Sequence, residues 1–206
     1  MAAKSMQCNE AERQRILDAA VTLFADSGYA GATMGRIAVS AGCSVGHLYS
    51  HFSSKQSLLE ELTTRFFRRL NQALDAVEAA PMRSPLSRYR MRLQALAREL
   101  GRDHRLVAVV LGEEAMLRSL ARRHVALMRE RDQALLGAAM EAGELPALDP
   151  RLLLAAMEGM IRALAALLAK EAPEKLGELG SLLDAIVITP LVAGTGMQHY
   201  EEDGRS

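Results

Sequence analysis

Residues 33–52 read TMGRIAVSAGCSVGHLYSHF and hold two short helical patterns on either side of Ala41-Gly42-Cys43. Thr33 and Ser44 stand where helix N-caps are expected, and Gly42 suits the left-handed conformation that ends a helix. A short helix, a tight turn and a second short helix form a helix-turn-helix. The second helix of such a unit enters the major groove of DNA, so this stretch predicts a DNA-binding unit.

Helical periodicity continues on both sides of this stretch. A first amphipathic helix is expected from about residue 9 or 10 to Ser27, with Gly28 just beyond its end. Ser53 and Gln56 have the spacing of a capping box at the start of a long fourth helix. Beyond Pro85, helices are expected at about 87–100, 104–111, 116–142, 151–170 and 174–192.

The composition favours an all-α protein. Half of the residues are hydrophobic, but only 4% are aromatic and Trp is absent. Leu, Ala and Met supply most of the apolar side chains and are good helix formers. The alternation of β-branched residues that is typical of strands is nearly missing.

The charge is unevenly distributed, although the chain is neutral overall. Residues 1–70 carry a net charge of +2, residues 71–131 carry +5 and residues 132–206 carry −7. A polyanion is therefore expected to approach the first part of the chain and to avoid the last. The small excess on residues 1–70 does not by itself establish nucleic-acid binding.

Other classes of protein find little support. Two cysteines, Cys8 and Cys43, give no disulfide framework, which fits a reducing cytoplasm. The apolar stretch 152–169 is long enough to span a membrane, but Glu158 and Arg162 in its middle favour a buried helix. No signal peptide, phosphate-binding glycine loop, nucleophile elbow or HExxH motif is present, so we expect no membrane association, no cofactor and no enzyme.

The residues ILDAAVTLFADSGYAGATMGRIAVSAGCSVGHLYSHFSSKQSLL closely resemble the DNA-binding domain of the TetR family of transcriptional regulators. The resemblance lies in the LF…GY segment at residues 23–29, the IA..AG helix at 37–42 and the LY.HF..K segment at 48–55. It covers roughly residues 12–60 without a large gap.

The outer face of the second short helix is expected to meet the base edges, and the resemblance implies further contacts to the phosphate backbone. A tyrosine hydroxyl at position 49 can donate to a phosphate oxygen. The expected DNA-binding residues are Thr33, Ser44, Val45, Gly46, His47, Tyr49, His51 and Lys55.

Cys43, His47 and His51 also lie at helical spacing, and Cys and His are zinc ligands. No fourth ligand is near in the sequence, and packing and DNA contacts account for the same residues. We therefore expect no metal site there.

The rest of the chain can bury a second core. The family resemblance implies a larger helical domain that binds a small ligand and dimerises. The candidate ligand contacts are Glu113, Met116, His124, Met128, Met157 and Met160.

The last two helices carry more apolar surface than one core needs, which predicts a four-helix dimer interface. Its candidate residues are Leu164, Leu168, Leu183, Ile186 and Val187.

The predicted organisation is a helix-turn-helix domain at 1–55, a ligand-binding and dimerisation domain at 56–194 and a tail at 195–206. The predicted function is a cytoplasmic repressor that binds a palindromic operator as a homodimer and is released by a small, largely apolar effector. The alternatives are a helical interaction protein with a degenerate helix-turn-helix and a regulator without a small-molecule ligand.

Overall fold

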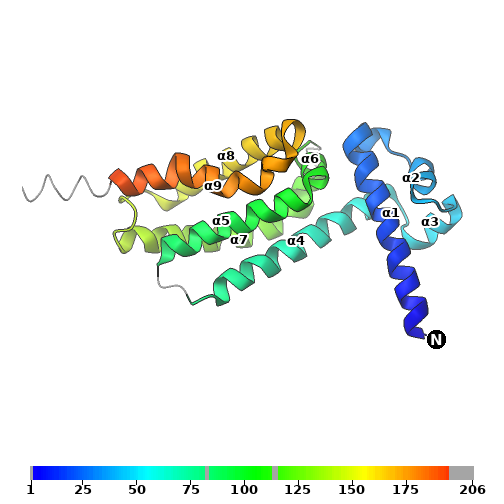
Figure 1. Cartoon of the computed structure of the whole chain (residues 1–206), viewed down its shortest axis with the longest axis horizontal. Coiled ribbons are helices and arrows are strands. Elements are labelled where there is room, and N and C mark those ends of the chain that lie inside the picture. Colours follow the sequence, from blue (N-terminus) through cyan, green and yellow to red (C-terminus); the bar gives the residue numbers. More distant parts are fainter. Residues whose placement is uncertain (1, 82–83, 113–115, 195–206) are drawn as a thin grey trace, which may run out of the picture. The chain divides into compact units, whose positions relative to one another are not determined.

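The computed structural model describes residues 2–81, 84–112 and 116–194, and the side-chain surroundings of residues 10–81, 84–109 and 125–194. Within this part of the chain the backbone is helical and contains no strand, which confirms the all-α prediction (Figure 1). The predicted tail at 195–206 lies outside the described residues.

The chain divides into two compact units. Unit 1 contains Met1–Phe66 and Arg105–Leu120, and unit 2 contains Phe67–His104 and Ala121–Ser206. The division falls within α4 (Lys55–Ala79), whereas the sequence placed the domain boundary at the start of that helix. One continuous helix therefore contributes to both units.

α1 (Ala2–Gly31) starts earlier than predicted, because residues 2–8 continue the helical backbone. Gly28 interrupts α1 with a positive φ of 70°, which confirms the expected end of the regular helix after Ser27. This conformation is readily adopted by glycine, which has no Cβ to clash with the backbone.

The two short helices are capped as the sequence predicts. The Thr33 side chain accepts a hydrogen bond from the Arg36 N–H at the start of α2 (Met34–Ala41). Gly42 ends α2 with a left-handed φ of 68°. The Ser44 side chain then accepts from the His47 N–H at the start of α3 (Val45–His51).

The capping box of α4 is one residue later than predicted. Ser54 and Ser57 exchange hydrogen bonds between their hydroxyls and backbone N–H groups, at 3.0 and 3.2 Å. Ser57 therefore takes the place that the sequence reading gave to Gln56. The Gln56 side chain instead donates to Glu60, one turn along the exposed surface.

Unit 1 has its own apolar core between α1, α2, α3 and the first part of α4. Figure 1 shows α2 and α3 beside one another as a separate pair of short helices. The innermost core side chains are Ile16, Leu17, Ala20, Phe24, Ile37, Leu48, Leu58 and Leu59. This packing fixes the orientation of α3 relative to α1.

Unit 2 is a bundle of longer helices. Its main elements are α5 (Pro85–Arg102), α7 (Met116–Glu141), α8 (Pro150–Glu171), η1 (Pro173–Glu178), α9 (Leu179–Leu183) and η2 (Asp184–Ile188). α6 (His104–Gly112) connects α5 and α7 in sequence, and helical backbone continues after η2 to residue 194.

Within unit 2, α5 packs against η1 and α9. A Cβ on Gly180 would lie 2.9 Å from the Leu93 carbonyl oxygen, so the close approach of α5 and α9 depends on a residue without a side chain.

The predicted cap of α8 is confirmed, since the Asp149 side chain accepts a hydrogen bond from the Arg151 N–H and Pro150 is the first residue of the helix.

Two segments, Pro150–Glu171 and Pro173–Gly194, are long and apolar enough to cross a membrane, by length and composition alone. Such a match is weak support, because core helices of soluble proteins give it as well. Glu158 in α8 forms an ion pair with Arg129 of α7, with one N–O distance of 2.9 Å. Only 22% of the apolar window of α8 is buried, so the prediction of a buried helix is wrong for the single chain. Its buried residues are Leu154, Met157 and Ala165.

Candidate functional site

α3 exposes a compact polar and apolar face while its opposite side is buried. Leu48 is completely buried and holds α3 against the core, whereas Val45 and Tyr49 are 43% and 51% exposed. The exposed residues include all those that the sequence places on the outer face of this helix: Ser44, Val45, Gly46, His47 and Tyr49. A helix that is apolar on its inner side and offers N-terminal side chains outward has the form that major-groove recognition requires.

The end of α3 is attached to α1 through Arg13. Its guanidinium donates to the His51 carbonyl oxygen at 3.3 Å and lies 4.3 Å from the centre of the Phe52 ring. The same group pairs with Glu61 of α4 at 3.3 Å. These contacts join α1, α3 and α4 and limit the motion of α3.

Thr33 is exposed at the start of α2. Its oxygen accepts the Arg36 N–H at 3.3 Å, which leaves the hydroxyl hydrogen available for a phosphate oxygen. Arg36 donates to the Gly31 carbonyl and the Ser27 hydroxyl, so its charge is held near the end of α1.

Lys55 has an internal role that the sequence reading did not include. Its ammonium group donates to the Tyr29 carbonyl oxygen and, at 2.9 Å, to that of Ala32. It also lies 4.2 Å from the centre of the Tyr29 ring, within cation–π range. These partners hold Lys55 against the end of α1, whereas the prediction placed it on a phosphate.

We expect Lys55→Met to lower the free energy of unfolding by about 1–3 kcal/mol, because charge-assisted hydrogen bonds to carbonyls are lost while the methylene packing is kept. Urea unfolding of wild type and variant measures this change. The salt dependence of DNA binding should stay the same. A variant of unchanged stability that loses about one phosphate contact in the salt slope would assign Lys55 to DNA instead.

His47 and His51 converge on Glu12 of α1. The Nε2 atom of His47 lies 2.9 Å from Glu12 Oε2, and that of His51 lies 3.7 Å from the same oxygen. The hydrogen bond from His47 is the main reason that the pKa of Glu12 is lowered. The His51 side chain is only 10% exposed, so it faces α1 more than the solvent.

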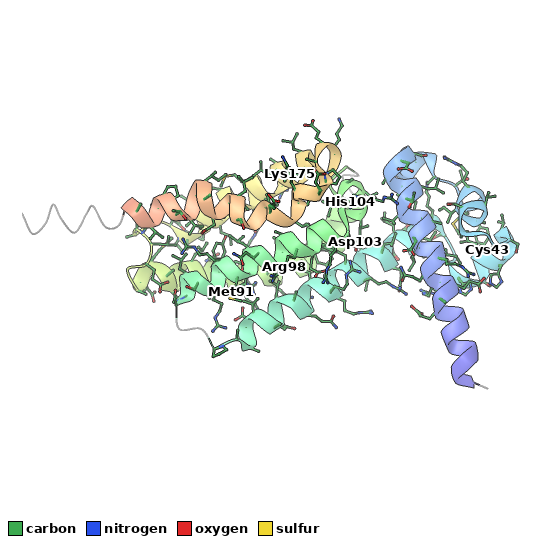
Figure 2. All side chains as sticks on the ribbon, viewed as in Figure 1. Cys43, Met91, Arg98, Asp103, His104 and Lys175 are labelled. Atoms are coloured by element: carbon green, nitrogen blue, oxygen red, sulfur yellow. The ribbon has the colours of Figure 1, made fainter. Side chains whose placement is uncertain are left out.

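Glu12 was not predicted, because 35 residues separate it from His47 and no local pattern links them. Cys43, which the sequence placed at helical spacing with the two histidines, lies in the turn between α2 and α3 (Figure 2). Burial raises the pKa of the Cys43 thiol, and the Glu12 charge acts in the same direction.

Three of the six candidate ligand contacts can be placed. Met157 is completely buried in α8, and Met128 and Met160 are half-buried in α7 and α8. Glu113 lies outside the described residues, and the side-chain surroundings of Met116 and His124 lie outside the described part as well.

A buried polar cluster in unit 2 was missed by the sequence reading. Arg92 is 2% exposed and pairs with Glu78 at 2.8 Å and with Asp132 at 2.5 Å. Burial raises the pKa of Asp132, and the charge of Arg92 opposes that effect. Burial also raises the pKa of Tyr89, and the negative charge of Asp132 acts in the same direction.

Two polar atoms of this cluster have no hydrogen-bond partner among the described residues. They are the Tyr89 hydroxyl and one terminal nitrogen of Arg92. Buried donors normally find a partner in protein, water or ligand. Their position within the helical bundle makes them candidate contacts for a bound polar group.

A separate cavity of about 540 Å³ lies between the end of α5 and η1. Figure 2 labels Arg98 of α5 and His104 of α6, which both line this cavity. Arg102 and, from η1, Glu174 also line it, so both signs of charge are present. This cavity was not predictable from the sequence, because the two segments that line it are about 70 residues apart in the chain.

The candidate dimer residues divide into two groups. Ile186 is 51% exposed, and Leu164, Leu168 and Val187 are half-buried. Leu183 is 1% exposed and packs inside unit 2, so it is not free to meet a partner. The exposed apolar side chains nearby are Leu152 and Leu167 of α8 and Leu182 of α9.

Residues 16–62 match the sequence model of the family described as bacterial regulatory proteins, tetR family. The HTH-type transcriptional repressor KstR of Rhodococcus jostii (strain RHA1) is 33% identical over 129 residues, which are 63% of this chain. The chain spans 57% of the length of that relative.

Solved structures share the fold over most of the chain. The ketosteroid transcriptional regulator KstR2 of Mycobacterium tuberculosis matches with a TM-score of 0.72 and 23% identity, over 87% of this chain and 94% of that one. AibR, solved in complex with isovaleryl coenzyme A and operator DNA, matches with a TM-score of 0.68 and 18% identity, over 86% and 98%. KstR and KstR2 are named as a transcriptional repressor and a transcriptional regulator, in agreement with the sequence analysis.

Proposed function

We propose that this chain is a TetR-family protein and a cytoplasmic transcriptional repressor that reads DNA with α3. The observation that carries this proposal is the exposed face of α3, with Leu48 buried behind it and His47 and Tyr49 in front. Base edges are read by side chains such as His47, while hydroxyls of Tyr49 and Thr33 suit the phosphates.

We propose a homodimer that recognises a palindromic operator. Two copies of α3 about 34 Å apart would meet successive major grooves on one side of DNA. The exposed apolar side chains of α8 and α9 support a second copy as the partner, because a monomer in water gains nothing from exposing them.

The effector is proposed to bind in the bundle of unit 2. Support comes from the partnerless Tyr89 hydroxyl and Arg92 nitrogen and from the buried Met157. A flexible methionine suits an apolar ligand, while the two donors suit a polar group on it. AibR, which has a similar fold, is described with a coenzyme A thioester bound. Release from DNA requires that the effector bind one arrangement of the dimer better than the other.

A helical interaction protein with a degenerate helix-turn-helix is the second candidate. One observation favours it: the cationic groups of Arg36 and Lys55 are both engaged by carbonyl oxygens of unit 1. Fewer free cations on this unit would weaken the attraction to phosphate.

Selection of bound sequences from random DNA by the full-length protein separates the two candidates. We expect a palindrome with half-sites about 10 base pairs apart and an affinity that falls with salt. No enrichment at low salt would favour the interaction protein.

Tyr49→Phe should weaken binding to all sequences by about 0.5–1.5 kcal/mol, through one lost hydrogen bond. His47→Ala should instead change the preferred base at one position of each half-site, and an unchanged consensus would remove His47 from the reading set.

A further inference from the structure

Glu12, His47 and His51 form a compact group of potential metal ligands on unit 1. One ligand atom from each, a carboxylate oxygen and two imidazole nitrogens, lies within 4.8 Å of the other two. His47 and His51 are one helical turn apart on α3, and α1 supplies Glu12. A search of the described residues for three or more His, Cys, Asp or Glu side chains with ligand atoms this close together finds this group.

The donor types suit a divalent transition metal. Zinc binds imidazole nitrogen and carboxylate oxygen at about 2.0–2.2 Å, which places two ligand atoms of a tetrahedral ion about 3.4 Å apart. The distances from Glu12 Oε2 to the Nε2 atoms of His47 and His51 are 2.9 and 3.7 Å, on either side of that value. Binding of an ion by all three side chains would lengthen the shorter of these two distances and shorten the longer one.

A simple ion pair explains only part of this arrangement. The contact of His47 with Glu12 is an ordinary hydrogen bond at 2.9 Å. His51, however, is largely buried and directs Nε2 toward the same carboxylate oxygen at a distance too long for a hydrogen bond. The two imidazoles meet edge to face with their centres 5.1 Å apart. A cation bound to both imidazole nitrogens and to the Glu12 carboxylate would bring all three groups into favourable contact.

We propose that Glu12, His47 and His51 bind one Zn²⁺ or a chemically similar divalent ion and that this ion attaches the DNA-reading helix α3 to α1. Three protein ligands leave the fourth coordination position of a tetrahedral ion for water. The ion would hold the His47 imidazole against α1. The expected consequence, which rests on the proposed function, is weaker DNA binding when the metal is present.

Titration of Zn²⁺ into the full-length, tag-free protein by calorimetry tests the site itself. The background carries Cys8→Ser and Cys43→Ser, so that thiols cannot supply the ligands. We expect one Zn²⁺ per chain. Glu12→Gln should weaken binding by about tenfold or more, because loss of an inner ligand costs at least as much as loss of an outer-shell partner. The matched control is Glu10→Gln, a glutamate on the same helix that pairs with Arg65 at 3.0 Å and should leave Zn²⁺ affinity unchanged.

Nuclear magnetic resonance of the imidazole nitrogens provides a readout that does not depend on a folded variant. Added Zn²⁺ should shift the Nε2 resonances of both His47 and His51 in the wild-type sequence. An absence of heat and of shifts with wild type, or equal affinity of Glu12→Gln and Glu10→Gln, would overturn the site.

Binding to the selected operator, measured with and without one equivalent of Zn²⁺, tests the consequence for DNA. We expect Zn²⁺ to weaken operator binding by wild type and by Glu10→Gln, and to leave Glu12→Gln unaffected. Equal operator affinity with and without Zn²⁺, in a protein that binds the ion, would overturn the regulatory part. A protein that binds Zn²⁺ as expected but selects no DNA would instead overturn the proposed function and leave the metal site standing.

Discussion

Arg92→Met is expected to lower the free energy of unfolding by about 3–5 kcal/mol, because it leaves two carboxylates beside a buried site without their cation. Arg92 is almost fully buried and pairs with Glu78 and Asp132. Met fills a similar volume, so the main loss is the positive charge that compensates two carboxylates. Urea unfolding at pH 7, followed by circular dichroism, measures the change.

The pH dependence identifies the cause of this loss. Burial already raises the pKa of Asp132, and removal of the opposing Arg92 charge should raise it further. A carboxyl group whose pKa is higher in the folded chain than in the unfolded chain destabilises the fold above that pKa. The penalty disappears below the unfolded value of about 3.9. The difference between Arg92→Met and wild type should therefore shrink as the pH falls from 7 toward 4.

The matched control for Arg92→Met is the same substitution at Arg129 in the same unit. Arg129 pairs with Glu158 of α8, but its side chain is more than half exposed. A solvent-exposed ion pair contributes about 0–1 kcal/mol, so Arg129→Met should have a small effect. Equal losses for the two variants would mean that the buried charges near Arg92 are not the cause.

Addition of Asp132→Asn to Arg92→Met should restore part of the stability, because it removes one uncompensated acid.

Features set by neighbouring residues were predictable from the sequence. Thr33 and Ser44 cap the helices that they precede, Gly42 ends α2, and Asp149 caps α8, because each interaction spans two to five residues. The capping box of α4 was placed one residue too early, since Ser53, Ser54 and Ser57 all offer suitable hydroxyls and only the geometry decides. The resemblance to the TetR family was confirmed by the match over residues 16–62.

Features that depend on tertiary packing were not predictable in the same way. Lys55 meets carbonyls of residues 29–32, and Glu12 meets imidazoles of α3, across distances in sequence that no periodicity encodes. Arg92 reads as an ordinary cation on an amphipathic helix, yet packing buries it among acids. Leu183 matched the apolar pattern of a dimer face, but that pattern cannot tell the inner side of a helix from its outer side.

The second large effect concerns the proposed dimer. Leu167→Glu combined with Ile186→Glu should convert the protein to a monomer and weaken operator binding by about 10²–10⁴-fold, because the two half-sites are no longer bound by one linked particle. Both side chains are about half exposed in the single chain, so the charges disturb its own core little. Light scattering after size-exclusion chromatography measures the mass, and titration of the selected operator measures the affinity.

The control for the dimer prediction is Leu127→Glu combined with Leu148→Glu, which adds the same charge at exposed leucines of α7 and of the loop before α8. These residues lie outside the exposed face of α8 and α9, so this variant should remain a dimer with normal operator affinity. A dimer that survives Leu167→Glu and Ile186→Glu would place the interface elsewhere.

A wild-type protein that is monomeric and floats with lipid vesicles would assign the apolar face to a membrane. A second copy is favoured because α8 also carries Arg162, an exposed charge that water around a soluble dimer accommodates and a bilayer interior does not.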